Sequence, residues 1–229
     1  MKSNRNFNFN RNEETREIDF LTVRFNLDDI YKHFIDNIHA INEQSKVIDR
    51  LNLNCDEANN IMRSQIVFLG SALDFYMHEL TKFGLCQIYD GIWPTTEKYY
   101  DIKIEMRIIE TPLKISISND WFLDCINELY KTVTMISYKS IKKQISLLGL
   151  NIETIANTAF PIENSLNKMK TILNSLFERR NVIAHQFDRN HYDAQVNIIS
   201  KEIVENFIYN IIKIVKSIHT HAQSMNIDK

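Results

Sequence analysis

Apolar residues recur three or four positions apart in four long stretches of the chain, which is the spacing that places them on one face of an α-helix. The stretches run from Asn26 to about Ile48, from about Asp56 to Phe83, onward from Pro161, and onward from Ser200. Their apolar stripes are Ile30, Phe34, Ile38 and Ile41; Ile61, Leu69, Leu73, Tyr76, Leu80 and Phe83; Ile162, Leu166, Met169, Leu173 and Leu176; and Ile208, Ile211, Val215 and Ile218. Four long amphipathic helices predict an all-α fold, a helical bundle with shorter helices between them.

Residues at the ends of these stretches support the same boundaries. Asn26 and Ser200 are good N-cap residues, and Pro161 suits the first helical position. Gly84 is placed to end the second helix in a left-handed cap. Within that helix the small residues 70–72 predict close approach of another helix.

The pattern is weakest over residues 85–118, which we treat as a small insertion. Pro94 and Pro112 bracket the segment, and apolar residues alternate in strand fashion from Ile102 to Ile108. A short extended segment and an irregular insertion both fit this pattern. Helical spacing returns over residues 119–135 and again over 138–148, where Gly149 follows.

Composition excludes several other architectures. Only 4 Gly and 3 Pro occur in 229 residues, too few for the tight turns of a β-sandwich or barrel, and no glycine-rich turn of a dinucleotide-binding fold is present. We therefore expect a single helical domain over residues 26–229. Residues 1–25 begin with an Asn-rich segment and are expected to form a mobile tail. A nucleic-acid-binding arm, with Arg5, Phe7, Phe9 and Arg11 as contacts, is the alternative for this tail.

Charge and cysteine content restrict the setting further. The formal net charge is −2, so any nucleic-acid contact must be a local patch. Cys55, Cys86 and Cys125 are an odd, widely spaced set that argues against a disulfide scaffold and fits a reducing, cytoplasmic environment. No His lies near a Cys at the spacing of zinc ligands. We therefore expect no metal or other cofactor, and no apolar run is long enough to predict a membrane partner.

The segment from Glu178 to Arg189 interrupts the apolar stripe of its helix with polar residues. Arg180 follows Leu173 and Leu176 on that stripe, and a guanidinium directed at a core or an interface requires a carboxylate or another anion, such as phosphate. His185 is the nearby side chain that exchanges a proton near neutral pH. Arg180 and His185 are five residues apart, about 140° around a helix. Either the helix ends between them or a second copy of the chain completes the pair.

This segment resembles the Arg-x4-6-His motif of the HEPN superfamily. The residues that carry the resemblance are RRNVIAH at 179–185, followed by QFDRN, and the match is closest to the RiboL-PSP-HEPN branch. The helix that contains FLGSALDFYMHELTKFGL at 68–85 is similar to the first core helix of that branch. The resemblance implies a helical, metal-independent endoribonuclease that acts as a homodimer. Arg179-x5-His185 also fits the motif, but Arg180 is favoured because a polar residue, Asn181, follows it as in the family.

RNA cleavage needs only what this motif supplies. The 2′-OH beside the scissile phosphate is the nucleophile, His185 can transfer a proton, and Arg180 can stabilise charge on the phosphorane. Asn181, four residues before His185 on the same helix face, is a supporting residue. Arg179 and Arg189 are candidates to bind neighbouring phosphates, with a solvated face as the alternative.

The resemblance also suggests a biological setting. It implies an RNA substrate, a toxin–antitoxin or antiphage role, and an antitoxin or sensor protein encoded nearby. The chief alternative is a non-catalytic HEPN-type module that binds RNA or a protein in a larger complex. A purely structural helical partner, in which the arginine forms a helix-end ion pair, is the third possibility.

Overall fold

The computed structural model describes residues 24–51, 55–114 and 121–225, and within these residues the protein is built from helices with no strand. The helices are α1 (Leu27–Leu51), α2 (Cys55–Tyr89), α3 (Glu97–Tyr100), α4 (Met106–Lys114), α5 (Trp121–Tyr130), α6 (Tyr138–Leu147), α7 (Ile152–Ala159), α8 (Ser165–Gln186) and α9 (Lys201–Ser224). The prediction of an all-α fold with four long helices and several short ones is confirmed. The proposed tail over residues 1–25 lies almost entirely outside the described residues.

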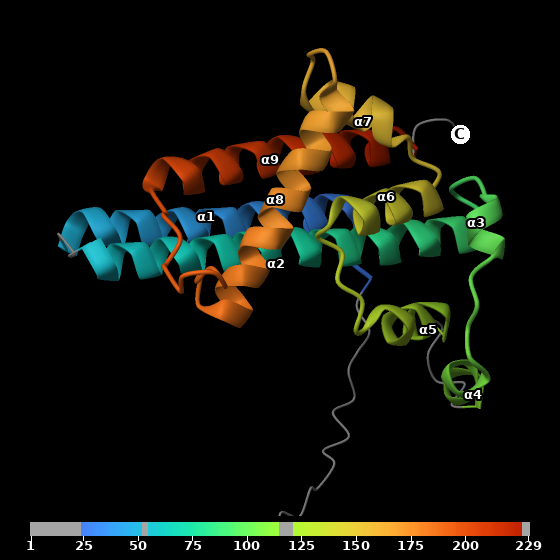
Figure 1. Ribbon diagram of the computed structural model, residues 1–229. Helices are drawn as coiled ribbons and strands as arrows, with labels where there is room; N and C mark the ends of the chain where they lie inside the picture. The colour runs from blue at the N-terminus through green and yellow to red at the C-terminus, as the bar shows by residue number, and fades with distance from the viewer. Residues whose placement is uncertain (1–23, 52–54, 115–120, 226–229) are drawn as a thin grey trace, which may run out of the picture.

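The long helices α1 and α2 form an antiparallel pair on which the other elements pack (Figure 1). Helix α9 lies along this pair, and α8 crosses it steeply. Helix α7 packs against both α8 and α9. Helices α3, α4 and α5 lie toward the C-terminal end of α2. The C-terminal end of α8 therefore reaches the first half of α2, and a loop leads from there into α9.

The apolar stripes predicted for α1, α2 and α9 form the core. Ile30, Phe34, Ile38 and Ile41 of α1 are at most 4% exposed, and the α2 residues Leu69, Leu73, Tyr76 and Leu80 are fully buried. In α9, Ile208, Ile211, Val215 and Ile218 are also buried. Burial of these side chains is the main source of stability for the bundle.

Both predicted N-caps are confirmed by hydrogen bonds. The side-chain oxygen of Asn26 accepts the backbone N–H of Asp29 at 2.8 Å, and the hydroxyl of Ser200 accepts that of Ile203 at 3.3 Å. Gly149 has a left-handed φ of 77° just beyond α6, as its place in the sequence predicts. Each of the two cap hydrogen bonds satisfies a backbone N–H that a helix start leaves without a partner.

Two predicted helix boundaries are wrong. Gly84 does not end α2, which continues to Tyr89, and its missing side chain instead makes room for Trp93 and Leu148. Pro161 does not begin α8, which starts at Ser165, and Ile162 is exposed rather than part of the buried stripe. At Gly84, tertiary packing outweighs the local preference for a helix end.

The segment before α6 also differs from its predicted structure. Met106 and Ile108 belong to helix α4, so the strand-like alternation over 102–108 does not reflect a strand. Helix α5 ends at Tyr130, short of Met135. Helix α7 was not predicted at all, because its eight residues provide only two turns of periodic pattern.

Replacement of Gly84 by Ala tests the close packing inside α2. Alanine normally favours a helix over glycine by about 1 kcal/mol, but a Cβ here would lie 2.7 Å from Leu148 Cδ2 and 2.8 Å from Trp93 Cζ3. We expect Gly84→Ala to lower the free energy of unfolding by about 1–3 kcal/mol in urea denaturation. Ser71→Ala, at an exposed position of the same helix, should change it by less than about 0.5 kcal/mol. A Gly84→Ala protein as stable as the wild type would show that this packing is loose.

Candidate active site at the end of helix α8

Both residues of the predicted motif lie within α8. The helix continues through His185 to Gln186, so it does not end between Arg180 and His185. Five helical residues separate their directions by about 140°. Arg180 is half-buried on the side of the helix that faces α2, whereas His185 is exposed in the last turn. One protomer therefore does not direct both side chains toward the same point.

Arg180 lies where α8 passes closest to α2. A Cβ on Gly70 would be 3.1 Å from Arg180 Cγ, so the absence of a side chain at Gly70 makes room for the arginine stem. This confirms the close approach that the small residues 70–72 predict. Arg180 Nη1 donates to Asn181 Oδ1 at 3.1 Å, while its buried Nε has no acceptor in the described part of the protein. No carboxylate among the described residues pairs with this guanidinium.

A buried aspartate just after α8, which sequence reasoning missed, organises the neighbouring residues. Asp188 is fully buried, and its Oδ2 accepts hydrogen bonds from Arg63 Nε and Arg179 Nη2, both at 2.8 Å. Asn197 Nδ2 donates to Asp188 Oδ1 at 3.2 Å, and Arg63 Nη2 donates to the Asn197 carbonyl at 3.2 Å. Through this Asp188 cluster (Asp188, Arg63, Arg179 and Asn197), α2, the end of α8 and the segment before α9 are joined.

Arg179 and Arg180, adjacent in sequence, thus have different surroundings. Arg179 is bound to Asp188, and a further hydrogen bond joins its Nη2 to the carbonyl of Ile198 at 2.9 Å. Burial lowers the pKa of the Arg179 guanidinium, and the charge of Asp188 opposes that shift. The geometry therefore gives Arg179 a structural partner that Arg180 lacks, while its predicted contact with a phosphate stays a prediction.

Arg189 belongs to the loop that connects α8 to α9. A β-bridge pairs it with Val196, and its Nη1 donates to the carbonyl of Ala194 at 2.7 Å. The residue is exposed, so the rest of its guanidinium faces solvent close to the end of α8. This position keeps Arg189 available for the predicted contact with a phosphate.

Two hollows adjoin the Asp188 cluster. One of about 560 Å³ is lined largely by polar residues, among them Asn59, Asn60, Arg189 and Asn197. The other, of about 380 Å³, is lined by Val67, Phe68 and Ile183 together with Phe187 and polar residues of α2. Phe187 borders both hollows, as do Asn60 and Arg63.

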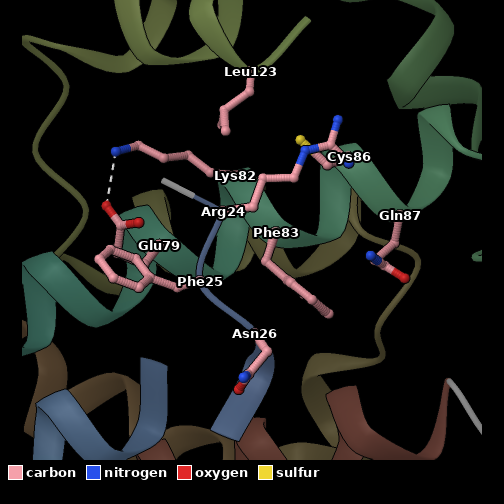
Figure 2. A pocket seen from close by; sticks show the side chains of 9 residues that line it. All are labelled: Arg24, Phe25, Asn26, Glu79, Lys82, Phe83, Cys86, Gln87 and Leu123. Atoms are coloured by element: carbon pink, nitrogen blue, oxygen red, sulfur yellow. Dashed lines mark hydrogen bonds and ion pairs between the residues drawn. The ribbon is translucent and has the colours of Figure 1, made fainter. Parts of the chain in front are cut away.

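A third cavity lies away from the motif, near the start of α1 (Figure 2). It has a volume of about 220 Å³ and mostly apolar walls, to which Phe25, Phe83 and Leu123 contribute. The ammonium of Lys82 at its edge is paired with Glu79 at 2.7 Å, as Figure 2 shows. Its volume is below the usual range of small-molecule sites, and it contains neither Arg180 nor His185.

The described residues contain no group of three His, Cys, Asp or Glu side chains able to hold a metal ion. They also contain no helix that is both long enough and apolar enough to cross a membrane.

Comparison with known proteins identifies the family. The family model RiboL-PSP-HEPN matches residues 26–224, which span α1 to the end of α9. The chain therefore belongs to the RiboL-PSP-HEPN family, a HEPN-type domain, and the resemblance noted from the motif is confirmed. Searches of curated proteins and of solved structures found no significant match.

The sequence carried a weak signal for the Asp188 cluster. Asp188 and Arg179 are nine residues apart on either side of a helix end, but Arg63 is separated from Asp188 by 125 residues. Only the packing of α8 on α2 brings these three charges together. From the sequence alone, Asp188 is therefore one residue of a polar segment with no sign of a separate role.

Replacement of Asp188 by Asn tests the cluster. Asparagine keeps the shape but leaves two adjacent guanidiniums without a carboxylate, so we expect the free energy of unfolding to fall by about 3–5 kcal/mol in urea denaturation. Asp193→Asn, at an exposed position of the following loop, is the matched control and should have little effect. A change of less than about 1 kcal/mol for Asp188→Asn would contradict a stabilising role.

Proposed function

We propose that this protein is a metal-independent endoribonuclease that acts as a homodimer, with His185 and Arg180 as its catalytic residues. The observation that carries the proposal is the state of Arg180, a half-buried guanidinium with no carboxylate partner among the described residues. Such a group has a strong affinity for an anion, and a phosphate matches its fork geometry. The exposed His185 follows Arg180 by about one and a half turns of α8 and supplies a group able to transfer protons.

The reaction needs no group beyond those that RNA and the two side chains supply. A histidine removes the proton from the 2′-OH, and the 2′-oxygen attacks the adjacent phosphorus. The guanidinium stabilises the additional negative charge on the phosphorane. The bond from phosphorus to the 5′-oxygen then breaks, and that oxygen takes up a proton. The products are a 2′,3′-cyclic phosphate and a 5′-hydroxyl, so DNA, which lacks the 2′-OH, is not a substrate.

A second copy of the chain resolves two difficulties of a single protomer. Arg180 and His185 diverge by about 140° on one helix. The reaction also needs a base and an acid on opposite sides of the phosphate, which one imidazole does not provide in a single step. A two-fold dimer with two α8 helices facing one cleft would place an Arg180 and two His185 side chains around the same phosphate.

An exposed apolar surface beside the motif is suited to this contact between copies. Phe68 and Phe75 of α2 are 49% and 38% exposed, and they line a groove of about 770 Å³ between α1 and α2. Phe68 also lines the hollow beside Ile183 of α8. Exposed aromatic residues that adjoin a functional site are typical of protein interfaces.

The remaining candidate residues have supporting roles in this proposal. Asn181 orients Arg180 through its side-chain oxygen. Arg189 binds a phosphate next to the scissile one, whereas Arg179 holds the end of α8 through Asp188.

The family resemblance supports a toxin or antiphage role, in which cleavage of cellular RNA stops growth. An antitoxin or sensor protein encoded nearby would then control the enzyme. In the alternative function, a non-catalytic module, Arg180 and His185 bind RNA or a partner protein without cleavage.

Substitution of the two motif residues tests catalysis. We expect His185→Ala and Arg180→Ala each to lower the rate of RNA cleavage by at least about 100-fold, because each removes a group that acts in the transition state. Cleavage is measured by gel analysis of RNA, and folding by circular dichroism. His39→Ala and Arg50→Ala, at exposed positions of α1, are matched controls that should keep full activity.

The same variants separate the rival functions. RNA binding without cleavage by the wild type would support a binding module. Neither binding nor cleavage, together with loss of stability in the variants, would support a structural role.

A charged substitution on α2 tests the dimer. We expect Phe68→Asp to yield a folded monomer without RNA cleavage, because a carboxylate in an apolar contact between copies is strongly unfavourable. Light scattering measures the mass, and Tyr209→Asp, at a 60% exposed position of α9, should remain dimeric and active. A monomeric wild type with full activity would refute the composite site.

A further inference from the structure

Phe187, the residue that follows α8, has an unusual backbone conformation. Its φ is 54° and that of Asp188 is 58°, so two consecutive residues with side chains adopt the left-handed region. Asp and Asn enter this region readily, but a bulky residue such as phenylalanine is rare there. Glycine and asparagine are the usual residues at such a helix end.

Folding does not account for a phenylalanine at this position. The side chain is 75% exposed, so its ring adds little to the apolar core. A left-handed conformation also disfavours any residue that has a Cβ, relative to glycine. Phe187 thus combines backbone strain with an exposed aromatic ring, and strain of this kind concentrates at functional sites.

The backbone at Phe187 is held in a defined position. The next residue, Asp188, is fixed by the two arginines of its cluster, and its N–H donates to the carbonyl of Val182 at 3.1 Å. Backbone motion at Phe187 is therefore limited from both sides. A ring carried on a constrained backbone loses less entropy when it binds a flat partner than one on a flexible loop.

The surroundings of the ring favour a nucleobase as that partner. The hollow of about 560 Å³ beside Phe187 is lined by Asn59 and Asn60 as well as by apolar residues. An asparagine amide can both donate and accept hydrogen bonds, as the edge of a base does. Arg189 at the same hollow supplies a positive charge for the adjoining phosphate. His185 lies only two residues before Phe187, at the same end of α8.

We propose that Phe187 is a stacking platform for a nucleobase of the RNA, in a subsite next to the linkage that the enzyme cleaves. This inference rests on the proposed function and extends it to a specific contact with the substrate. Stacking on an aromatic side chain accommodates every base, so the subsite contributes affinity for unpaired RNA more than sequence preference. Single-stranded RNA is accordingly the preferred form of the substrate at this position.

Binding of a short single-stranded RNA that contains 2-aminopurine tests the proposal, because the fluorescence of this base falls when it stacks. The measurement uses full-length His185→Ala protein, so that the RNA stays intact. We expect added Phe187→Gly to weaken binding by about 5- to 100-fold and to abolish the fluorescence decrease, whereas Phe187→Tyr preserves both. Tyr100→Ala, at a 68% exposed position of α3, is the matched control and should bind normally.

A stability measurement separates this role from a structural one. Glycine relieves the left-handed strain, so the melting temperature of Phe187→Gly should equal or exceed that of the wild type. Unchanged RNA affinity, a lower melting temperature, or conversion of the dimer to a monomer would each overturn the proposal, the last by assigning Phe187 to the contact between copies. Cleavage assays on His185→Ala report separately on the proposed function, since base stacking by Phe187 and proton transfer by His185 can fail independently.

Discussion

The ion pairs of the buried Asp188 carboxylate determine how the two adjacent arginines, Arg179 and Arg180, differ in their surroundings. Asp188 accepts a hydrogen bond from Arg63 on α2 and another from Arg179 on α8, both at 2.8 Å. Two guanidiniums on one carboxylate leave an excess positive charge beside the end of α8, and burial strengthens every interaction within the cluster. Because Arg179 is bound in this way, the adjacent Arg180 is the arginine that remains without a carboxylate partner among the described residues. The position of one aspartate therefore distinguishes the two adjacent arginines, of which we propose Arg180 as the catalytic one.

The helical geometry of the motif has a direct consequence for assembly. Helix α8 continues past His185, so the two motif residues keep the divergence of about 140° that five helical residues impose. The close passage of α8 over Gly70 fixes the arginine stem against α2 and leaves the histidine on the outside. This arrangement is the reason for our proposal that two copies of the chain form one site.

Particular residues show what sequence reasoning can and cannot predict here. The stripes of α1, α2 and α9 were predictable because burial imposes a 3.6-residue period, and Asn26 and Ser200 were predictable because a cap acts on its own helix end. Gly84 was misinterpreted since local preference suggests a helix end, whereas the contact with Trp93 and Leu148 depends on the assembled fold. In the candidate site, Arg180 and His185 are predicted from the polar interruption of their helix and from the resemblance of RRNVIAH to the family motif, and their catalytic role stays a prediction. The role of Asp188 depends on Arg63, which is 125 residues away, and so only the structure reveals it.

The turn after α8 consists of a residue that stabilises the fold, Asp188, and a residue with a proposed function, Phe187. Asp188 tolerates its left-handed backbone because its side chain and its carbonyl both accept hydrogen bonds, from the arginines and from Asn197. The exposed ring of Phe187 makes no comparable stabilising contact. The hydrogen bonds of the neighbouring Asp188 therefore have to offset the backbone strain at Phe187. Hydrogen bonds that stabilise the fold thereby permit a phenylalanine at position 187, where stability alone would favour glycine. The buried Asp188 cluster thus adjoins and constrains the residue that we propose to stack on a base.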